Sequence, residues 1–359
     1  MSKAYFFSSP YQGCSYLRCL LPQLHGGYNG SWSSLYGELK DPKKILEGAI
    51  HAEVAVFHRP DKTENHKVAY ELKKMGKKIV FDNDDTFKLL KGNPSFDKKE
   101  LQNIRREKTL GNILDNFINN SDAVTTTTEF LAKEYRKINK NVHVIPNCVD
   151  PDDWDESKHN EGDKVRIALV GSVVYSEDFK TIKGYISELD KDPRVQLVMF
   201  GLDNKKNRDK NKFITKLHNK EYTYWDSLEN LEHVPWVAMK DYFETLNDLK
   251  IDIMLIPRAD TYFNRCKSNV KFLEAGMVEC AVIAQTFTTK DSPYDFDLDG
   301  ENGLLAGSEE EWREQTELLI SNKELRREIG RKAKEYVLAN YHIKDHVDKW
   351  ASLFNQLTK

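Results

Sequence analysis

The sequence has no long hydrophobic run. Its longest apolar segments, such as residues 251–257, are far shorter than the roughly 20 residues that a membrane-spanning helix needs. The N-terminal residues MSKAYFFSSP enter a short apolar segment without the basic stretch that opens a signal peptide. We therefore expect neither a membrane span nor a signal peptide.

Cysteine is scarce, and its pattern argues against two kinds of site. The chain has five cysteines, an odd number with no C-x-x-C pair among them: Cys14, Cys19, Cys148, Cys266 and Cys280. This pattern favours neither a disulfide framework nor a zinc site. Reduced thiols suit the cytoplasm, so we expect a cytoplasmic protein.

An excess of charge of one sign is also missing. Lysine and arginine number 54 against 57 aspartates and glutamates, and the formal net charge is −3. The chain as a whole has no attraction to nucleic acid, although the basic stretch 88–108 would suit a local contact weakly. Its 39% hydrophobic and 31% charged residues indicate a globular chain, and 359 residues suit two domains.

Short apolar runs alternate with helical patterns in the first part of the chain. Residues 4–7, 54–57, 78–81 and 123–126 read as strands, and residues 63–75 and 101–118 read as helices. This alternation is typical of a parallel α/β sheet.

A second alternation follows a cluster of turn-forming residues. A strand at 142–145 leads into Pro146 and then into Asp150–Asp153, after which strands are expected at 165–170, 195–200, 251–256 and 280–284. Two successive α/β units predict two Rossmann-like domains with a cleft between them. Ligands of such sheets bind at the carboxyl ends of the strands.

The last 51 residues, 309–359, read as helices with breaks near residues 321–322 and 341–342. Trp350 and Phe354 lie four residues apart, on one face of the last helix. We expect this helix to cross back to the N-terminal domain. The predicted domains are 1–148 with 340–359, and 149–339.

The strongest chemical signal is the segment from Pro257 to Gly276. A strand ends at Pro257, and a helix is expected to begin at Ser268, a good N-cap residue. A helix N-terminus offers free backbone N–H groups and a positive dipole end to a diphosphate. Four cations lie nearby: Arg258, Arg265, Lys267 and Lys271. Spacing alone is equally compatible with an ordinary surface helix carrying scattered charge.

This segment resembles the donor-binding motif of glycosyltransferase family 4, a large family of retaining enzymes with the GT-B fold. Glu274 falls on the second glutamate of the family's E-x7-E pattern, and residues 282–284 fall on its closing strand. Four other stretches resemble family motifs in the family's order: residues 121–126, 145–150, 170–172 and 299–305. The short N-terminal domain also resembles that of transferases encoded by phages.

The resemblance implies a GT-B fold, with two Rossmann-like domains, a central cleft and a C-terminal helix crossing back. It implies transfer of a sugar from a nucleotide-diphosphate sugar to an acceptor hydroxyl, with retention and with no metal or other cofactor. Lys267 and Lys271, with Arg258 and Arg265, would stabilise the leaving diphosphate. The implied donor-binding residues are Gly171, Ser172, Gly201, Pro235, Trp236, Ser268, Asn269 and Glu274.

Two departures from the family pattern bear on the donor site. Cys266 stands where the family has its first glutamate, which changes the expected sugar contacts. Glu279 stands where the family has a glycine after the helix, and glutamate tolerates a positive φ poorly.

The acceptor side is expected at the ends of the N-terminal strands. The run from Lys78 to Asp85 ends in an acidic D-x-D-D pattern. Asp82 and Asp84 would orient acceptor hydroxyls, whereas in the alternative GT-A fold they would hold Mg²⁺ or Mn²⁺. Capping of a following helix by Asp84 or Asp85 is an equally good explanation. Three further residues complete the expected acceptor side: Gly13, Arg18 and His58.

Three functions therefore remain open from sequence. The first is a retaining GT-B glycosyltransferase, and the second is a metal-dependent GT-A transferase. The third is a GT-B relative such as a sugar-nucleotide epimerase or a non-catalytic binder. The sugar, the nucleobase, the oligomeric state and the acceptor, whether a glycan, a small molecule or a modified nucleobase in DNA, are not defined by the sequence.

Overall fold

The structure, a computed structural model, describes residues 3–8, 12–30, 49–60, 63–86, 111–172, 175–202 and 219–359. The chain divides into two compact units. The first contains Met1–Asp150, Arg265–Ser268 and Asn340–Lys359, and the second contains Pro151–Asn264 and Asn269–Ala339.

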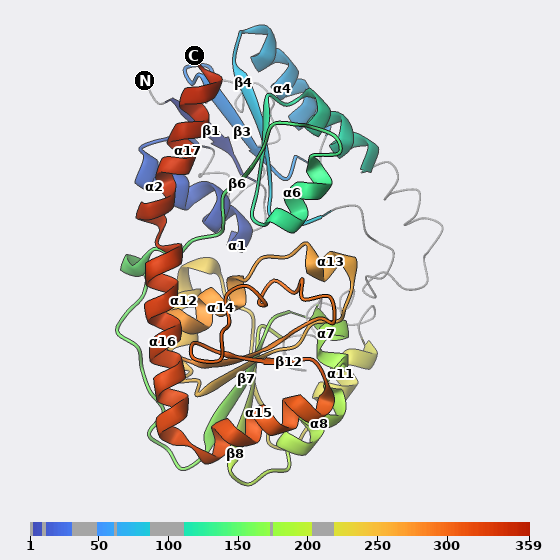
Figure 1. Cartoon of the computed structure of the whole chain (residues 1–359), viewed down its shortest axis with the longest axis vertical. Coiled ribbons are helices and arrows are strands. Elements are labelled where there is room, and N and C mark those ends of the chain that lie inside the picture. Colours follow the sequence, from blue (N-terminus) through green and yellow to red (C-terminus); the bar gives the residue numbers. More distant parts are fainter. Residues whose placement is uncertain are drawn as a thin grey trace. The chain divides into compact units, whose positions relative to one another are not determined.

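The first unit is built on a six-stranded parallel sheet with the order β2-β1-β3-β4-β5-β6 (Figure 1). Its strands are β1 (Ala4–Phe7), β2 (Asn29–Gly30), β3 (Val54–His58), β4 (Lys78–Asn83), β5 (Ala123–Thr126) and β6 (Val142–Val144). The strands β1, β3, β4 and β5 are almost fully buried, as expected for a parallel sheet covered on both faces.

Alternate residues of each strand point to opposite faces of this sheet. One face carries Phe6, Val56 and Val80, which pack against Trp350 and Phe354 of α17 (Ile343–Leu357). The Phe6 ring centroid lies 5.3 Å from that of Trp350. The prediction that the last helix packs on the N-terminal sheet is therefore confirmed.

The other face carries the next residues along the strands. Phe57 and Phe81 approach Phe117, whose ring centroid lies 5.3 Å from that of Phe57 and 6.0 Å from that of Phe81. Phe117 belongs to the helical residues 111–120. The remaining described helices are α1 (Gln12–Ser15), the π-helical turn Tyr16–Leu20, α2 (Leu21–Gly26), α4 (Thr63–Lys74) and α6 (Glu129–Tyr135).

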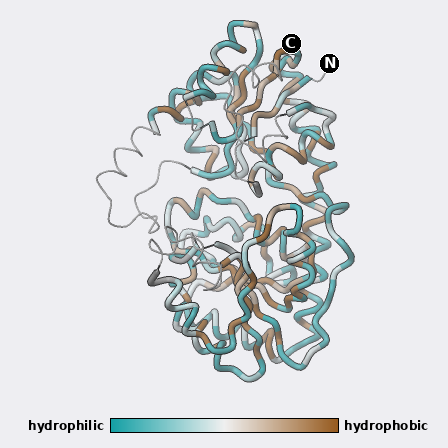
Figure 2. The backbone as a smooth tube through the Cα atoms, turned by 180° about the vertical axis from the view of Figure 1, so that it is seen from behind, coloured by the Kyte–Doolittle hydropathy of each residue, from teal (hydrophilic) through white to brown (hydrophobic). Residues whose placement is uncertain are grey.

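The second unit has its own six-stranded parallel sheet, with the order β12-β11-β10-β7-β8-β9. Its strands are β7 (Val165–Val170), β8 (Val195–Phe200), β9 (Glu232–Val234), β10 (Ile253–Ile256), β11 (Ala281–Gln285) and β12 (Leu304–Ala306). Hydrophobic residues concentrate along the strands of each unit, and hydrophilic ones along the outer helices (Figure 2).

Helices cover this second sheet and close its core, which includes Ile167, Leu197, Ile283 and Trp312. They are α7 (Ser176–Lys180), α8 (Lys183–Leu189), α11 (Asn219–Trp225), α12 (Met239–Asp248), α13 (Tyr262–Arg265), α14 (Val270–Met277), α15 (Glu309–Ser321) and α16 (Lys323–Tyr341), with Pro151–Asp153 forming a 3-10 turn. A capping box between Ser308 and Glu311 begins α15.

The expected strands and C-terminal helices are confirmed, including the breaks at residues 322 and 342. Three short strands were not expected: β2, β9 and β12. The expected helical residues 101–110 and the basic stretch 88–108 lie outside the described residues. No described helix is both long enough and apolar enough to cross a membrane.

Candidate functional site

Two glycines bring the loops after β7 and β8 of the second unit into contact. Gly201 has φ 101°, and a Cβ atom built on it would lie 3.0 Å from the carbonyl oxygen of Gly171. The Gly171 N–H donates to the Phe200 carbonyl at 2.8 Å. A side chain at residue 201 would strain the backbone and crowd the neighbouring loop, which explains glycine at this strand end.

Close to these strand ends, a lysine, a glutamate and a tyrosine form a hydrogen-bonded triangle. Lys271 Nζ donates to Glu274 Oε2 at 2.6 Å and to Tyr242 Oη at 3.1 Å, and the Tyr242 hydroxyl donates to Glu274 Oε2 at 2.8 Å. The Tyr242 ring stacks on the ring of Phe200, the last residue of β8, and the two ring centroids lie 5.3 Å apart. The triangle is therefore fixed between α12, α14 and the end of β8.

The charges of this triangle stabilise one another. Burial alone would lower the pKa of Lys271, but the Glu274 carboxylate raises it well above its ordinary value. Burial also raises the pKa of Tyr242, and the Glu274 carboxylate adds to this effect. Lys271 is therefore a permanent cation and Tyr242 a neutral phenol at physiological pH.

A second buried cation follows β10. Arg258 is 5% exposed, and its Nη1 donates to Asp178 Oδ2 at 2.8 Å. Asp178 Oδ1 also accepts from the Ala259 N–H at 3.0 Å and from Asn264 Nδ2 at 2.7 Å. Burial would lower the pKa of Arg258, but Tyr294, Asp178 and Tyr175 outweigh it and raise the pKa above its ordinary value.

One donor of Arg258 has no hydrogen-bond partner among the described residues. Its Nη2 donates to Tyr294 Oη at 3.3 Å, whereas its buried Nε makes no hydrogen bond within that part of the chain. The guanidinium lies over the Tyr175 ring, 4.7 Å from its centroid. Tyr175 also contributes to the raised pKa of Lys271, so Lys271 and Arg258 both lie near this tyrosine. An unsatisfied buried donor of this kind suits an anionic ligand.

The helix that follows begins slightly later than the sequence predicts. Helix α14 begins at Val270 with Asn269 as its N-cap, so the N-cap position assigned to Ser268 is wrong by one residue. Ser268 Oγ instead accepts from Asn147 Nδ2 at 2.9 Å, and Asn269 Nδ2 donates to Asp297 Oδ2 at 2.7 Å. Lys271 lies in the first turn of α14, where backbone N–H groups are free of intrahelical bonds.

The other residues expected to bind the donor lie in loops or at the end of a short helix, and several are exposed or partly exposed. Pro235 and Trp236 follow β9, and the Trp236 side chain is 58% exposed. Ser172 follows Gly171 and is partly exposed. Arg265 ends the short helix α13, which occupies part of the expected loop. Cys266 is fully buried, so its thiol is enclosed at the position of the family's first glutamate.

Glu279 adopts a left-handed conformation despite its side chain. Its φ is 53°, and its Oε1 accepts from Lys334 Nζ at 2.9 Å. The expected tight turn is thus retained without glycine, with an ion pair on the substituting side chain.

The acidic run at the end of β4 lies in the first unit, where each carboxylate contacts a cation. Asp84 Oδ1 lies 2.6 Å from Arg59 Nη2, and Asp85 Oδ2 lies 3.2 Å from Lys267 Nζ. Arg59 itself has φ 49°. The helix expected after Asp85 falls on residues outside those that the structure describes.

Asp82 is the centre of a fully buried polar network. Arg18 donates to both carboxylate oxygens, at 2.6 Å and 3.2 Å, and Thr125 Oγ1 donates at 2.7 Å. His58 Nδ1 lies 2.8 Å from Asp82 Oδ2, and its buried Nε2 lies 4.0 Å from Asp84 Oδ1 without a hydrogen-bond partner among the described residues. Burial alone would raise the pKa of Asp82, but Arg18 and His58 bring it below its ordinary value.

The anion that Arg18 meets is therefore Asp82, a residue of the same unit. Arg18 also donates to the Ile145 carbonyl at 2.6 Å and lies over the Trp350 ring at 5.4 Å. Gly13, in α1, is exposed, and a Cβ built there meets nothing within 4 Å.

Sequence reasoning missed the partners of the predicted cations. Tyr242 and Asp178 come from α12 and α7, far along the chain from Lys271 and Arg258. Neither lies in a recognisable motif. Hydrophobic periodicity signals only that α12 is a helix.

Two other kinds of site are absent from the described ranges. No group of three or more metal-ligating side chains occurs there. All five cysteines belong to those ranges, and none of them forms a disulfide.

Comparisons with known proteins agree with this architecture. Residues 185–352 match the family model described as glycosyl transferase-like. No curated protein sequence matches the chain. TarM of S. aureus superimposes with a TM-score of 0.60 and 14% identity over 85% of this chain; the match covers 55% of TarM, so this chain spans about half its length.

Two solved structures match over nearly their whole length. Anabaena HepE in complex with UDP-glucose gives a TM-score of 0.68 at 12% identity, covering 99% of this chain and 100% of HepE. An alpha-glucosyltransferase (AGT) in complex with UDP gives a TM-score of 0.64 at 13% identity. The match covers 98% of this chain and 99% of the AGT chain.

Two separate six-stranded parallel sheets and these neighbours overturn the alternative GT-A assignment. The chain has the GT-B fold, and its residues 185–352 match the glycosyl transferase-like family model.

Proposed function

We propose that the protein is a retaining GT-B glycosyltransferase that moves a sugar from a nucleotide-diphosphate sugar to an acceptor hydroxyl. The observation that carries this proposal is a pair of cations, the partly buried Lys271 and the buried Arg258, beside the glycine turns at the carboxyl ends of β7 and β8. Ligands of parallel α/β sheets bind at such strand ends. The glycosyl transferase-like match includes both cations, and the structural neighbours named above bind UDP or UDP-glucose.

In this proposal the two cations neutralise the diphosphate. Lys271 stands in the first turn of α14, whose N-terminal N–H groups add positive potential. The unsatisfied Nε of Arg258 supplies a further donor. Glu274 binds the ribose, because a carboxylate accepts two hydroxyl hydrogen bonds. Its Oε2 accepts from Lys271 and Tyr242, which leaves Oε1 as the proposed ribose acceptor.

The proposed transfer proceeds with retention at the anomeric carbon. The bond between the anomeric carbon and the diphosphate oxygen breaks, and the acceptor oxygen bonds to the same face of the sugar. The acceptor proton passes to the leaving diphosphate. Lys271 and Arg258 stabilise the negative charge that grows on this leaving group, so their effect is greatest in the transition state.

Lys267 stays a predicted diphosphate contact, although it pairs with Asp85 in the structure. We also propose that the reaction needs no metal ion, that the protein is cytoplasmic, and that the acceptor binds to the first unit.

A panel of nucleoside diphosphates tests donor binding and metal dependence together. We expect calorimetric titration to find one diphosphate that binds, with a Kd that changes less than about twofold when EDTA is added. Hydrolysis of the matching nucleotide sugar, with water as acceptor, should also persist in EDTA. Loss of binding in EDTA and its recovery with Mn²⁺ would show that the donor site depends on a metal.

Glu274→Ala tests the assignment of the ribose. Hydrogen bonds to a charged group contribute about 1.5–3 kcal/mol, so the affinity for the preferred nucleotide should fall by about ten- to a hundredfold. Calorimetry with the same nucleotide measures this change, and a melting curve checks folding.

Glu314→Ala is the matched control, because Glu314 is exposed on α15 of the same unit. It should bind the nucleotide like the wild type. Unchanged affinity in well-folded Glu274→Ala would place the ribose elsewhere.

A further inference from the structure

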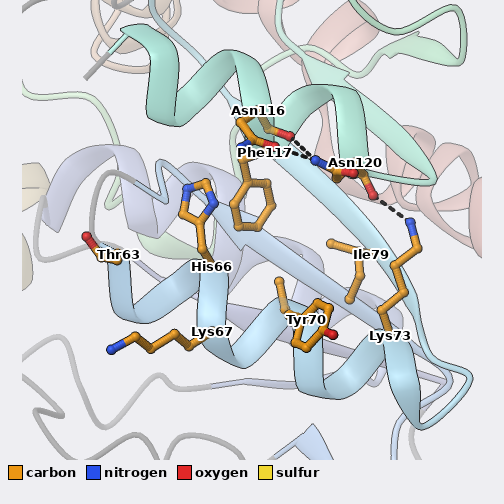
Figure 3. A pocket seen from close by; sticks show the side chains of 10 residues that line it. Thr63, His66, Lys67, Tyr70, Lys73, Ile79, Asn116, Phe117 and Asn120 are labelled. Carbon is orange, nitrogen blue, oxygen red and sulfur yellow. Dashed lines mark hydrogen bonds between the residues drawn. The ribbon is translucent and has the colours of Figure 1, made fainter. Parts of the chain in front are cut away.

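The first unit contains a groove that plays no part in the proposed transfer. It lies between α4 and the helical residues 111–120, beside Ile79 at the start of β4 (Figure 3). Its volume is about 500 Å³, within the range of small-molecule sites. Residues 63, 66, 67, 70 and 73 line it at helical spacing, so a single face of α4 forms one wall.

The charge of the groove favours an anion. Among the described residues, its lining includes Lys67 and Lys73 but no aspartate or glutamate. Lys73 Nζ donates to the Asn120 carbonyl at 2.6 Å and lies 3.8 Å from Asp122 Oδ2. Lys67 is exposed and, among the described residues, has no hydrogen-bond or ion-pair partner. Lys67 is thus the cation available to a ligand.

Aromatic side chains line the same groove. Tyr70 is 62% exposed, although a large aromatic ring gains free energy from burial. The His66 and Phe117 rings meet edge to face, with centroids 4.8 Å apart, and Figure 3 shows both beside the groove. Lys74 Nζ lies 4.3 Å from the Tyr70 ring centroid and adds positive charge beside it.

Among the described residues, His66 is a groove residue with an unsatisfied polar atom. Its Nε2 is buried and has no hydrogen-bond partner, which is uncommon for a ring nitrogen in a folded protein. Burial lowers the pKa of His66, so the ring is neutral at pH 7. A neutral imidazole can pair with a ring nitrogen or amino group of a heterocycle.

We propose that this groove binds a mononucleotide, with the base against Tyr70 and His66 and the phosphate at Lys67. A mononucleotide joins a flat, hydrogen-bonding heterocycle to a phosphate anion, which is the combination that these side chains complement. Stacking of a base on an aromatic side chain commonly contributes to nucleotide affinity. The residues that line the groove are not among those proposed to bind the donor.

Titration of the full chain with AMP tests this inference. The Glu274→Ala background weakens nucleotide binding at the proposed donor site, so it isolates the groove. We expect saturable AMP binding there, and at least tenfold weaker binding in Tyr70→Ser and in Lys67→Glu. Adenosine should bind more weakly than AMP because it lacks the phosphate, and inorganic phosphate alone should bind more weakly than AMP because it lacks the base.

Matched controls separate local from general effects. Met75→Ser removes an exposed apolar side chain just beyond α4, and Lys133→Glu reverses an exposed charge on α6. Both should bind AMP like the parent protein. Absence of saturable AMP binding, or equal losses in the controls, would overturn the groove assignment. Failure of every nucleoside diphosphate to bind the wild type would instead contradict the proposed function while leaving the AMP result intact.

Discussion

Arg18→Ala should destabilise the first unit by about 3–5 kcal/mol, the usual cost of removing one partner of a buried ion pair. Arg18 is 1% exposed and Asp82 is fully buried, so the substitution would leave a carboxylate without its main counter-charge. It would also release the Ile145 carbonyl and the contact with Trp350. Urea unfolding followed by circular dichroism measures the loss.

Two comparisons make this prediction specific. Arg136→Ala breaks an exposed pair with Glu129 in the same unit and should cost less than about 1 kcal/mol. The double variant Arg18→Met with Asp82→Leu removes both charges and should be more stable than Arg18→Ala. A loss below about 1 kcal/mol for Arg18→Ala would contradict a structural role for this pair.

Gly330→Ala should destabilise the second unit by about 3 kcal/mol, at the upper end of typical overpacking. A Cβ at residue 330 would lie 2.1 Å from the Glu279 carbonyl oxygen and 2.6 Å from its carbonyl carbon. This contact is with backbone, so no flexible side chain can move away. Helix α16 would have to shift from the turn that precedes β11. Differential scanning calorimetry should show a lower Tm.

Gly184→Ala provides the control, because this glycine also lies in a helix of the second unit. The nearest atom to its added Cβ is Glu309 Oε1, at 3.6 Å, an ordinary contact. Alanine is favoured over glycine in helices by up to about 1 kcal/mol, so this variant should be neutral or slightly stabilised. An unchanged Tm in Gly330→Ala would show that α16 does not pack closely on this turn.

The buried strands could be predicted from sequence because apolar residues predominate in the strands of a covered parallel sheet. β1, β5, β7 and β8 begin and end at the predicted residues. β2 could not be predicted in this way, since it consists only of Asn29 and Gly30, two residues that also favour turns. Its strand geometry comes from pairing with β1.

The candidate site could likewise be predicted from sequence only in part. Lys271 and Glu274 are three residues apart on one helix, so their contact follows from local geometry. The pairing of Arg258 with Asp178 joins residues 80 positions apart and depends on how α7 packs beside β10. The helix start was misplaced because Ser268 and Asn269 are both good N-caps, and tertiary contacts of both side chains decide between them.

The packing of α17 on the first sheet has a consequence for synthesis on the ribosome. Phe6, Val56 and Val80 belong to the first quarter of the chain, yet Trp350 and Phe354 cover them. The second unit, residues 151–264 and 269–339, is made between these two segments. One apolar face of the nascent first sheet therefore stays exposed while the whole second unit is translated. Chaperones that recognise apolar surface should engage this nascent chain until residues 343–357 emerge.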